Sequence, residues 1–453
     1  MRALWRMVAV VILLACLAVA LHGAAPATVT VDYTKSKQTV AGFGASITWV
    51  AIDLKNFPAA DQTTILNALY STSMPSAGLS IVRAGSMLCE FNPSPGVYDW
   101  NHVLIQDEIN WINRVKSTYG VNNVMVTTWT PPAWVKENNA CSNGGAVLPQ
   151  YYPDLANTMV LWMQNARASL GQEVNVWSVQ NEPTTTPDYD SAEYTPQQFI
   201  DFVTGHLKPA MQSAGLTSKI MLPEPAVYGG AAYFDGNWTT PLLSNPTMNA
   251  QLDVVATHGY AQTSDLGDMS KAVSVYGKPM WQTEVSFGRS YNGGMADALG
   301  SANSIYRALN LGGFNAWFYW WALDFTTGNG GLIKYSNATF TYQIPKRTYA
   351  IGNFSRFIRP GSVVLTSSST NSNLQVTAVR PASGSVTIVV TNTSKQSISA
   401  NINLSGLSVP PSTVTPYRTS STENHAVLSA IPVSGGSFSV TVPAQSIVTF
   451  VGN

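Results

Sequence analysis

Val179-Gln180-Asn181-Glu182-Pro183 closes a short apolar run that begins at residue 174, and Trp281-Gln282-Thr283-Glu284 closes a second run that begins at residue 279. Both runs are uncharged until their last residues, and segments with helical periodicity lie between runs of this kind. The pattern is typical of parallel strands that helices cover on both faces. Each run also ends at a glutamate, so polar side chains gather where these strands finish.

Six further runs share this character, and together they indicate the architecture. The eight predicted strands are 39–45, 79–83, 124–128, 174–179, 219–222, 252–257, 279–282 and 316–319. The segments with helical periodicity include 103–116, 155–170, 197–214 and 296–311. Eight strands that alternate with helices are the count of a (β/α)8 TIM barrel. We therefore predict an α/β fold with the barrel at residues 39–358.

After about residue 360 the helical spacing disappears, and short alternating runs rich in Ser, Thr and Val take its place. Such runs, separated by turn residues, predict a side β-sandwich at residues 359–453. An amino-terminal strand within residues 26–38 is expected to join that sheet. Because residues 345–365 contain no Ser/Gly-rich or Pro-rich linker, the two domains should pack tightly.

The first 25 residues have the pattern of a secretory signal peptide. Arg2 and Arg6 precede an uncharged run from residue 7 to residue 21, and small residues follow it. This order predicts export and cleavage, with a secreted, extracellular or periplasmic location and no membrane attachment afterwards. Lipoprotein anchoring at Cys16 is the alternative.

Composition excludes several classes of function. The 24 basic and 24 acidic side chains leave a net charge of zero, so no basic excess favours nucleic acid. With 45% hydrophobic residues the chain has enough apolar surface to fold. The glycine pairs near residues 312 and 330 lack the strand–GxGxxG–helix context, and cysteine and histidine do not cluster. We expect no cofactor, no metal and no nucleic-acid partner.

Two cysteines, Cys89 and Cys141, remain once the signal peptide is removed. They follow the second and third predicted strands, whose loops are neighbours on one face of a barrel. An exported chain permits a disulfide between them, and we predict one. Two unpaired thiols are the alternative.

The two strand-end glutamates suggest the chemistry. In a (β/α)8 barrel the catalytic groups lie at the carboxyl ends of the strands, so Glu182 and Glu284 should face each other across the barrel mouth. Two facing carboxyl groups are what glycoside hydrolysis requires. A single acid at a strand end is more often a helix cap or a solvated group, so the pair carries the interpretation.

At this point the sequence resembles a known family, glycoside hydrolase family 30, and most of all its bacterial xylanase branch. The resemblance covers nearly the whole mature chain. Its motifs are Gly42-Phe43-Gly44-Ala45, Leu79-Ser80-Ile81-Val82-Arg83, Trp129-Thr130-Pro131-Pro132-Ala133-Trp134, Ser178-Val179-Gln180-Asn181-Glu182-Pro183, Thr257-His258-Gly259-Tyr260, Thr283-Glu284, Trp320-Trp321, and the segments 349–361 and 443–450.

The resemblance implies roles for the matching residues. Glu182 would be the acid/base and Glu284 the nucleophile of a retaining reaction. Asn181 would hold the sugar 2-hydroxyl, Arg83 would support Glu284 from below, and Tyr260 would donate a hydrogen bond to the same carboxylate.

Other residues of the matching motifs receive expectations of a different kind. His258 is expected to be a structural histidine behind Tyr260. Trp49, Trp129 and Trp320 are expected to contact sugar, whereas Trp134 and Trp321 could equally be packing residues.

The resemblance also implies a substrate, a polysaccharide of the plant cell wall. We expect an endo-β-1,4-xylanase, with a β-1,6-glucanase or β-1,6-galactanase of the same family as the alternative and a non-catalytic carbohydrate-binding protein as the second. Many relatives hold a glucuronosyl carboxylate with an arginine in the loop after the nucleophile. In this chain that loop is short and Arg289 is its one cation, so we expect weak or no dependence on glucuronic acid.

Overall fold

The computed structural model describes residues 25–73, 75–227, 238–260, 266–382 and 386–452. The predicted signal peptide lies outside the described residues except for residue 25. Among the helices within these ranges, none is long and apolar enough to cross a membrane.

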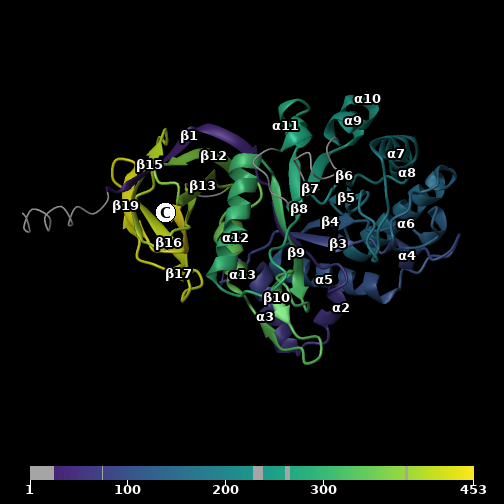
Figure 1. Ribbon diagram of the computed structural model, residues 1–453, viewed down its shortest axis with the longest axis horizontal. Helices are drawn as coiled ribbons and strands as arrows, with labels where there is room; N and C mark the ends of the chain where they lie inside the picture. Colours follow the sequence, from purple (N-terminus) through teal and green to yellow (C-terminus); the bar gives the residue numbers. More distant parts are fainter. Residues whose placement is uncertain (1–24, 74, 228–237, 261–265, 383–385, 453) are drawn as a thin grey trace, which may run out of the picture.

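Eight parallel strands close into a barrel, which confirms the predicted fold (Figure 1). In chain order they are β2 (Gly42–Ser46), β3 (Ile81–Gly85), β4 (Asn123–Thr127), β5 (Val176–Ser178), β6 (Lys219–Pro223), β7 (Val254–His258), β8 (Met280–Glu284) and β9 (Ala316–Asp324). Each strand pairs with the next, and β9 pairs with β2 to close the ring. Two short strands, β10 (Gly331–Tyr335) and β11 (Tyr342–Gln343), extend the sheet beyond β9.

Helices surround the barrel. They are α2 (Ala51–Leu54), α3 (Ala59–Tyr70), α4 (Leu88–Phe91), α5 (Val103–Tyr119), α6 (Tyr152–Leu170), α7 (Pro196–Phe202), α8 (Lys208–Ser213), α9 (Thr239–Ser244), α10 (Pro246–Gln251), α11 (Lys271–Ser274), α12 (Met295–Tyr306) and α13 (Lys346–Ser355). The predicted helix 197–214 is divided into α7 and α8 by a π-helical turn, Val203–Leu207. Pro209 lacks the N–H that would continue the regular ladder there, which accounts for the wider turn.

The barrel interior is packed with apolar side chains. Its core residues are Ile81, Met125, Val176, Met221, Val254, Ala256, Trp281, Ala316 and Phe318. Gly44 is required beside this core, because a Cβ atom at its position would lie 2.4 Å from the Phe318 ring. The barrel is therefore solid below its mouth, and space for a ligand remains at the carboxyl ends of the strands.

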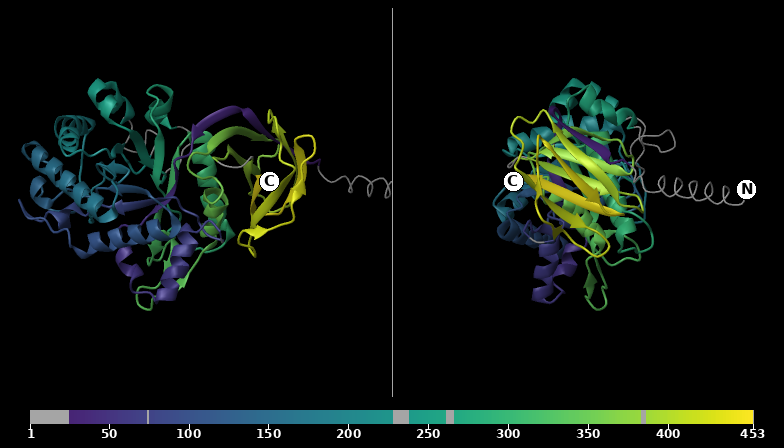
Figure 2. Two further views of the ribbon diagram at one scale, coloured as in Figure 1. Left: turned by 180° about the vertical axis from the view of Figure 1, so that it is seen from behind. Right: turned by 90° about the vertical axis from the view of Figure 1, so that its left-hand side faces the viewer.

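The second domain is a β-sandwich formed by both ends of the described chain. Its strands are β1 (Ala27–Thr39), β12 (Val363–Ser369), β13 (Leu374–Arg380), β14 (Thr387–Asn392), β15 (Ile398–Ser405), β16 (Thr413–Thr419), β17 (Ala426–Val427), β18 (Ile431–Pro432), β19 (Ser437–Val442) and β20 (Ser446–Gly452). β1 pairs antiparallel with β12 and parallel with β15. β19 contacts β14 and β20 without pairing with them, across a shared apolar core. Figure 2 shows β1 running along this domain.

α12 and α13 lie between the barrel and the sandwich (Figure 1). Asn353 in α13 donates to the Tyr417 carbonyl and to the Thr449 hydroxyl, each at 3.0 Å. Gln38 donates to the Leu309 carbonyl at 2.7 Å. Side-chain hydrogen bonds therefore join the two domains directly.

Candidate active site

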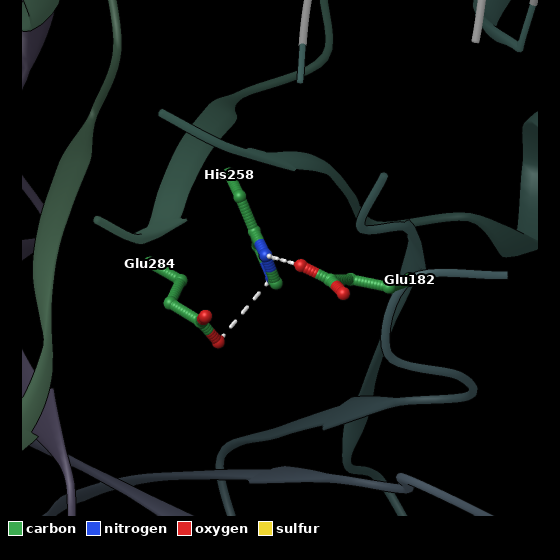
Figure 3. A group of neighbouring side chains, drawn as sticks. All are labelled: Glu182, His258 and Glu284. Atoms are coloured by element: carbon green, nitrogen blue, oxygen red, sulfur yellow. Dashed lines mark hydrogen bonds and ion pairs between the residues drawn. The ribbon is translucent and has the colours of Figure 1, made fainter. Parts of the chain in front are cut away.

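Glu182 and Glu284 meet at the barrel mouth. Glu284 is the last residue of β8, and Glu182 lies four residues after the end of β5. Both are buried, and a carboxylate oxygen of each lies within 4.8 Å of the other. Figure 3 shows the two carboxyl groups on either side of His258. The structure thus brings the two predicted glutamates together.

Two donors hold the Glu284 carboxylate. Arg83 Nη1 donates to Oε2 and Tyr260 Oη donates to Oε1, each at 2.5 Å. Burial, followed by the Glu284 charge, raises the pKa of Tyr260 well above its usual value, so this phenol remains a donor. Both contacts are those expected from the resemblance. They orient both oxygens of the carboxylate.

Arg83 is a buried hub below the cleft. It is fully inaccessible to solvent, and its guanidinium also donates to Asn181 Oδ1 at 2.8 Å and approaches Glu224 Oε1 at 3.3 Å. Burial alone would lower the pKa of Arg83, but Glu224 and Glu284 outweigh it and raise that pKa. The side chain is a fixed cation, and its contact with Asn181 sets the orientation of that amide.

His258 lies closer to the two glutamates than the sequence predicted. It was expected behind Tyr260, and its ring does lie 6.0 Å from the Tyr260 ring. Its Nδ1 atom, however, is 2.9 Å from Oε1 of Glu182, and Nε2 is 3.7 Å from Oε2 of Glu284. The ring therefore lies between the two carboxyl groups, where its charge acts on both.

Glu224 was missed in the sequence interpretation. It follows β6 directly and is fully buried, with its carboxylate near Arg83 and His258. The signal that selected the other two glutamates also applies here, because Leu222-Pro223-Glu224-Pro225 places an acid at the tip of the fifth barrel strand.

Glu182, His258 and Glu284 present one nitrogen or oxygen atom each within 4.8 Å, a spacing that a metal ion could use. Their present partners argue against that use. Burial lowers the pKa of His258, but the surrounding carboxylates outweigh it and raise that pKa to about 9, so a metal ion would have to displace a proton from the ring. Arg83 already neutralises Glu284.

The cleft above the glutamates is lined with aromatic rings. A cavity of about 420 Å³ is bounded by Trp49, Trp129, Asn181, Glu182, Tyr189, Tyr260, Glu284, Trp320 and Trp321. Trp49 has a left-handed backbone, with φ of +63°, and its ring lies 5.3 Å from Trp129 and 6.3 Å from Trp320. The three tryptophans expected to contact sugar thus stand together in the cleft.

Trp321 and Trp134, which the sequence left open between sugar binding and packing, occupy different environments. Trp321 stacks on Trp320 at 4.8 Å and lines the cavity. Trp134 packs against Tyr151 at 5.4 Å and donates to the Asn92 carbonyl, outside the cavity lining. Tyr189 was missed, and its position in the loop after Glu182 was the available signal.

Cys89 and Cys141 form a disulfide with their Cα atoms 6.1 Å apart. The bond joins the short helix α4, which follows β3, to the loop after β4, as expected from the order of the strands. It braces one wall of the barrel mouth.

Arg289 lies exposed in the loop after β8, and the described residues offer it neither an ion pair nor a side-chain hydrogen bond. The side chains that line the described part of the cavity include neither lysine nor arginine.

Two family models match the chain. The model for the glycosyl hydrolase family 30 beta sandwich domain matches residues 361–450, and the model for a glycosyl hydrolase catalytic core matches residues 133–310. Each match lies in the corresponding structural domain.

Sequence relatives cover most of the chain. The glucuronoxylanase XynC of Bacillus subtilis is 27% identical over 443 residues, which are 94% of this chain and 92% of the relative. An endo-1,6-beta-D-glucanase of Neurospora crassa is 23% identical over 385 residues, 74% of each chain.

Solved structures agree with this similarity. The catalytic domain of the GH30 xylanase C from Talaromyces cellulolyticus superposes with a TM-score of 0.80 at 27% identity, covering 94% of this chain and all of that one. The family 30 subfamily 8 xylanase Xyn30A from Clostridium acetobutylicum gives 0.77 at 28% identity, over 94% and 99% of the two chains. The chain therefore carries a glycosyl hydrolase catalytic core and a family 30 beta sandwich domain, is a glycoside hydrolase, and resembles the xylanase branch of glycoside hydrolase family 30.

Proposed function

We propose that the protein is an exported endo-β-1,4-xylanase that acts with retention of anomeric configuration. The observation that carries the mechanism is the separation of Glu182 and Glu284. One carboxylate oxygen of Glu182 lies within 4.8 Å of one carboxylate oxygen of Glu284. Retaining enzymes hold their carboxyl groups about 5–5.5 Å apart, whereas inverting enzymes leave about 6.5–9.5 Å for a water molecule. The short separation favours a covalent intermediate.

In the first step Glu284 is the nucleophile. Its carboxylate attacks the anomeric carbon while the glycosidic C–O bond breaks, and Glu182 gives its proton to the departing oxygen. Arg83 and Tyr260 orient the attacking carboxylate through both of its oxygens. Asn181, held by Arg83, is placed to bond the sugar 2-hydroxyl.

In the second step the glycosyl ester at Glu284 is hydrolysed. Glu182, now a carboxylate, takes a proton from water as the water oxygen attacks the anomeric carbon. The ester bond breaks and the Glu284 carboxylate is restored. One side chain thus acts first as acid and then as base.

The aromatic cleft supports a glycan substrate. Flat rings bind the apolar faces of sugars and lose little conformational entropy when ordered. Trp49, Trp129 and Trp320 supply such faces around the two glutamates. Xylan is favoured as the glycan because the relatives named as xylanases align along almost the entire chain.

Dependence on a glucuronosyl side group should be weak or absent. A carboxylate is usually held by a guanidinium, which can donate two parallel hydrogen bonds. The side chains lining the described cavity include no such cation. Arg289, the cation considered from the sequence, is an exposed residue of the loop after β8.

A β-1,6-glucanase is the second candidate, and the similarity to the Neurospora crassa enzyme favours it. Export is supported by the predicted signal peptide at residues 1–25 and by the Cys89–Cys141 disulfide, which suits an oxidising compartment.

The test is depolymerisation of a defined panel: glucuronoxylan, enzymatically de-glucuronosylated xylan, linear β-1,4-xylooligosaccharides, β-1,6-glucan and β-1,6-galactan. We expect cleavage of all three xylan substrates at comparable rates, absent in Glu284→Gln. Cleavage of the β-1,6-glucan alone would support the second candidate. Cleavage of glucuronoxylan alone, lost in Arg289→Ala, would contradict the predicted independence of side groups. Binding without cleavage of any glycan would indicate a carbohydrate-binding protein.

A further inference from the structure

A third buried carboxylate lies beside the two glutamates and has no part in the proposed bond changes. Glu224 Oε1 lies 3.3 Å from Nη2 of Arg83 and 3.7 Å from Nε2 of His258. Its Oε2 accepts a short hydrogen bond from the Ser178 hydroxyl. A fully buried carboxylate is costly unless cations compensate it, so its role depends on the charges around it.

Contacts around Glu224 favour its ionised form. Burial would raise the pKa of Glu224, but Arg83 above all, followed by His258 and Ser178, lowers it to about 2. The group is therefore an anion at neutral pH. Its position differs from that of Glu284, because Glu224 is not among the residues that line the cavity.

His258 is the cation that faces all three carboxyl groups. Its Nε2 atom has no hydrogen-bond partner and lies 3.7 Å from both Glu224 and Glu284, while Nδ1 bonds Glu182. Tyr260 is the remaining titratable group against the ring, and it stays neutral. A buried imidazolium is costly unless anions compensate it, so its protonation depends on the carboxylates around it.

The charge count shows what Glu224 contributes. The proposed mechanism begins with Glu182 as the acid and Glu284 as a carboxylate, so with Arg83 and His258 as cations and Glu224 as an anion the net charge before the first step is zero. In the glycosyl-enzyme Glu284 is a neutral ester and Glu182 has lost its proton, and the net charge is again zero. Without the Glu224 charge, either a buried positive charge is left over or His258 releases its proton.

We propose that Glu224 is a positioning residue that keeps His258 an imidazolium, so that one fixed positive charge serves Glu284 in the first step and Glu182 in the second. The assignment rests on the proposed double displacement. His258 is 2.9 Å from one glutamate and 3.7 Å from the other, close enough to stabilise whichever is ionised.

The backbone of Glu224 has a separate function that a substitution can leave in place. Its carbonyl accepts a hydrogen bond of 3.0 Å from the Glu182 N–H, and both residues have a left-handed backbone, with φ of +60° and +43°. Glu224→Gln keeps the side-chain shape and this carbonyl while it removes the charge. Glu224→Asp keeps the charge.

The first experiment is the pH profile of kcat/KM on a glycan that the wild-type enzyme cleaves. Glu224→Gln should move the high-pH limb to lower pH by about one unit or more, the usual effect of losing an opposite charge at this distance. The change in KM should be smaller than the change in kcat. Glu224→Asp should restore the limb. Glu423→Gln, which removes an ion-paired glutamate in the sandwich, is the matched control and should leave the limb in place. An unshifted limb in folded Glu224→Gln would overturn the proposal.

The second experiment needs no catalytic activity. The imidazole resonances of His258 in the whole wild-type protein, assigned by comparison with His258→Asn, report its protonation directly. We expect an imidazolium at pH 8, and a neutral ring there would overturn the proposal. An imidazolium in a protein that cleaves no glycan would count against the proposed function alone.

Discussion

The guanidinium of Arg83 lies 4.6 Å from the centre of the Trp129 ring, while its Nη1 atom is 2.5 Å from Glu284. One buried cation therefore supports both a cleft aromatic and the predicted nucleophile. The planar guanidinium holds its donors in a rigid fork and stacks on an aromatic ring, and the compact ammonium of lysine provides neither property.

Arg83→Lys should therefore lower kcat/KM by about 10²-fold, the effect of losing one preorganised donor. The positive charge remains, so the loss would reflect geometry. Steady-state kinetics together with a thermal melt will measure it. Activity within about threefold of wild type in a folded variant would mean that charge alone suffices.

Glu182 and Glu284 should respond differently to an external nucleophile. Glu182→Ala is expected to lower kcat by roughly 10²–10⁴-fold, and azide should restore turnover of an activated aryl glycoside, because the glycosyl-enzyme still forms. The product, analysed by NMR, should be the β-glycosyl azide. Rescue of Glu284→Ala with a β-configured azide product would reverse the two roles.

Phe325 should extend the binding surface beyond the cavity. Its ring is 43% exposed and stacks on Trp321 at 6.2 Å. Phe325→Ala should raise KM on long xylooligosaccharides by about two- to tenfold, the value of one aromatic contact. The shortest cleavable oligosaccharide should be unaffected.

Phe325→Trp is the conservative variant and should retain the wild-type KM. Tyr98→Ala removes another exposed aromatic, outside the cavity lining, and serves as the control. An equal loss on short and long substrates would show that Phe325 supports the loop and not the sugar.

The Cys89–Cys141 bond should contribute measurably to stability. It closes a loop across 52 residues of sequence, and bonds of this kind typically stabilise by about 2–4 kcal/mol. The double variant Cys89→Ala, Cys141→Ala should lose that amount of unfolding free energy in a urea titration. No change in the midpoint would indicate that the native packing of the two loops is sufficient.

Acid should weaken the junction between the domains through His425. Burial first, followed by Arg356, lowers the pKa of His425 to about 3, while its ring bonds the Tyr349 carbonyl in α13. Between pH 6.5 and 3 the unfolded chain binds a proton here that the folded chain does not, so stability falls as pH decreases through this window. His425→Gln should flatten that slope in thermal melts recorded across the window. An unchanged slope would assign the acid sensitivity to other groups.

Local pattern predicted the strands well where burial on both faces makes the sequence uniformly apolar, as in β4 and β6. It failed at the end of β9, which was expected to stop at residue 319 and continues to Asp324. The extension depends on pairing with β10, as in Gly331 with Trp321, and this contact is not visible in a short window of sequence.

In the candidate active site, too, some residues could be predicted from local sequence and others could not. Glu182 and Glu284 were selected because two acids close apolar strands that face each other across the barrel mouth. The place of His258 could not be predicted, because the approach of Nδ1 to Glu182 depends on the relative height of β5 and β7. Tyr189 enters the cleft from a loop, where no periodicity sets its direction.

The pairing of β1 has a consequence for the order in which the protein forms. β1 lies between β12 and β15. Both neighbouring strands follow β1 by more than 300 residues in the sequence, so the ribosome synthesises them long after β1. During synthesis the first strand must remain unpaired while the entire barrel emerges. A barrel expressed without the last 90 or so residues would keep this strand with two open edges, which invite aggregation. Removal of residues 25–41 together with the sandwich is therefore the rational design for an isolated barrel.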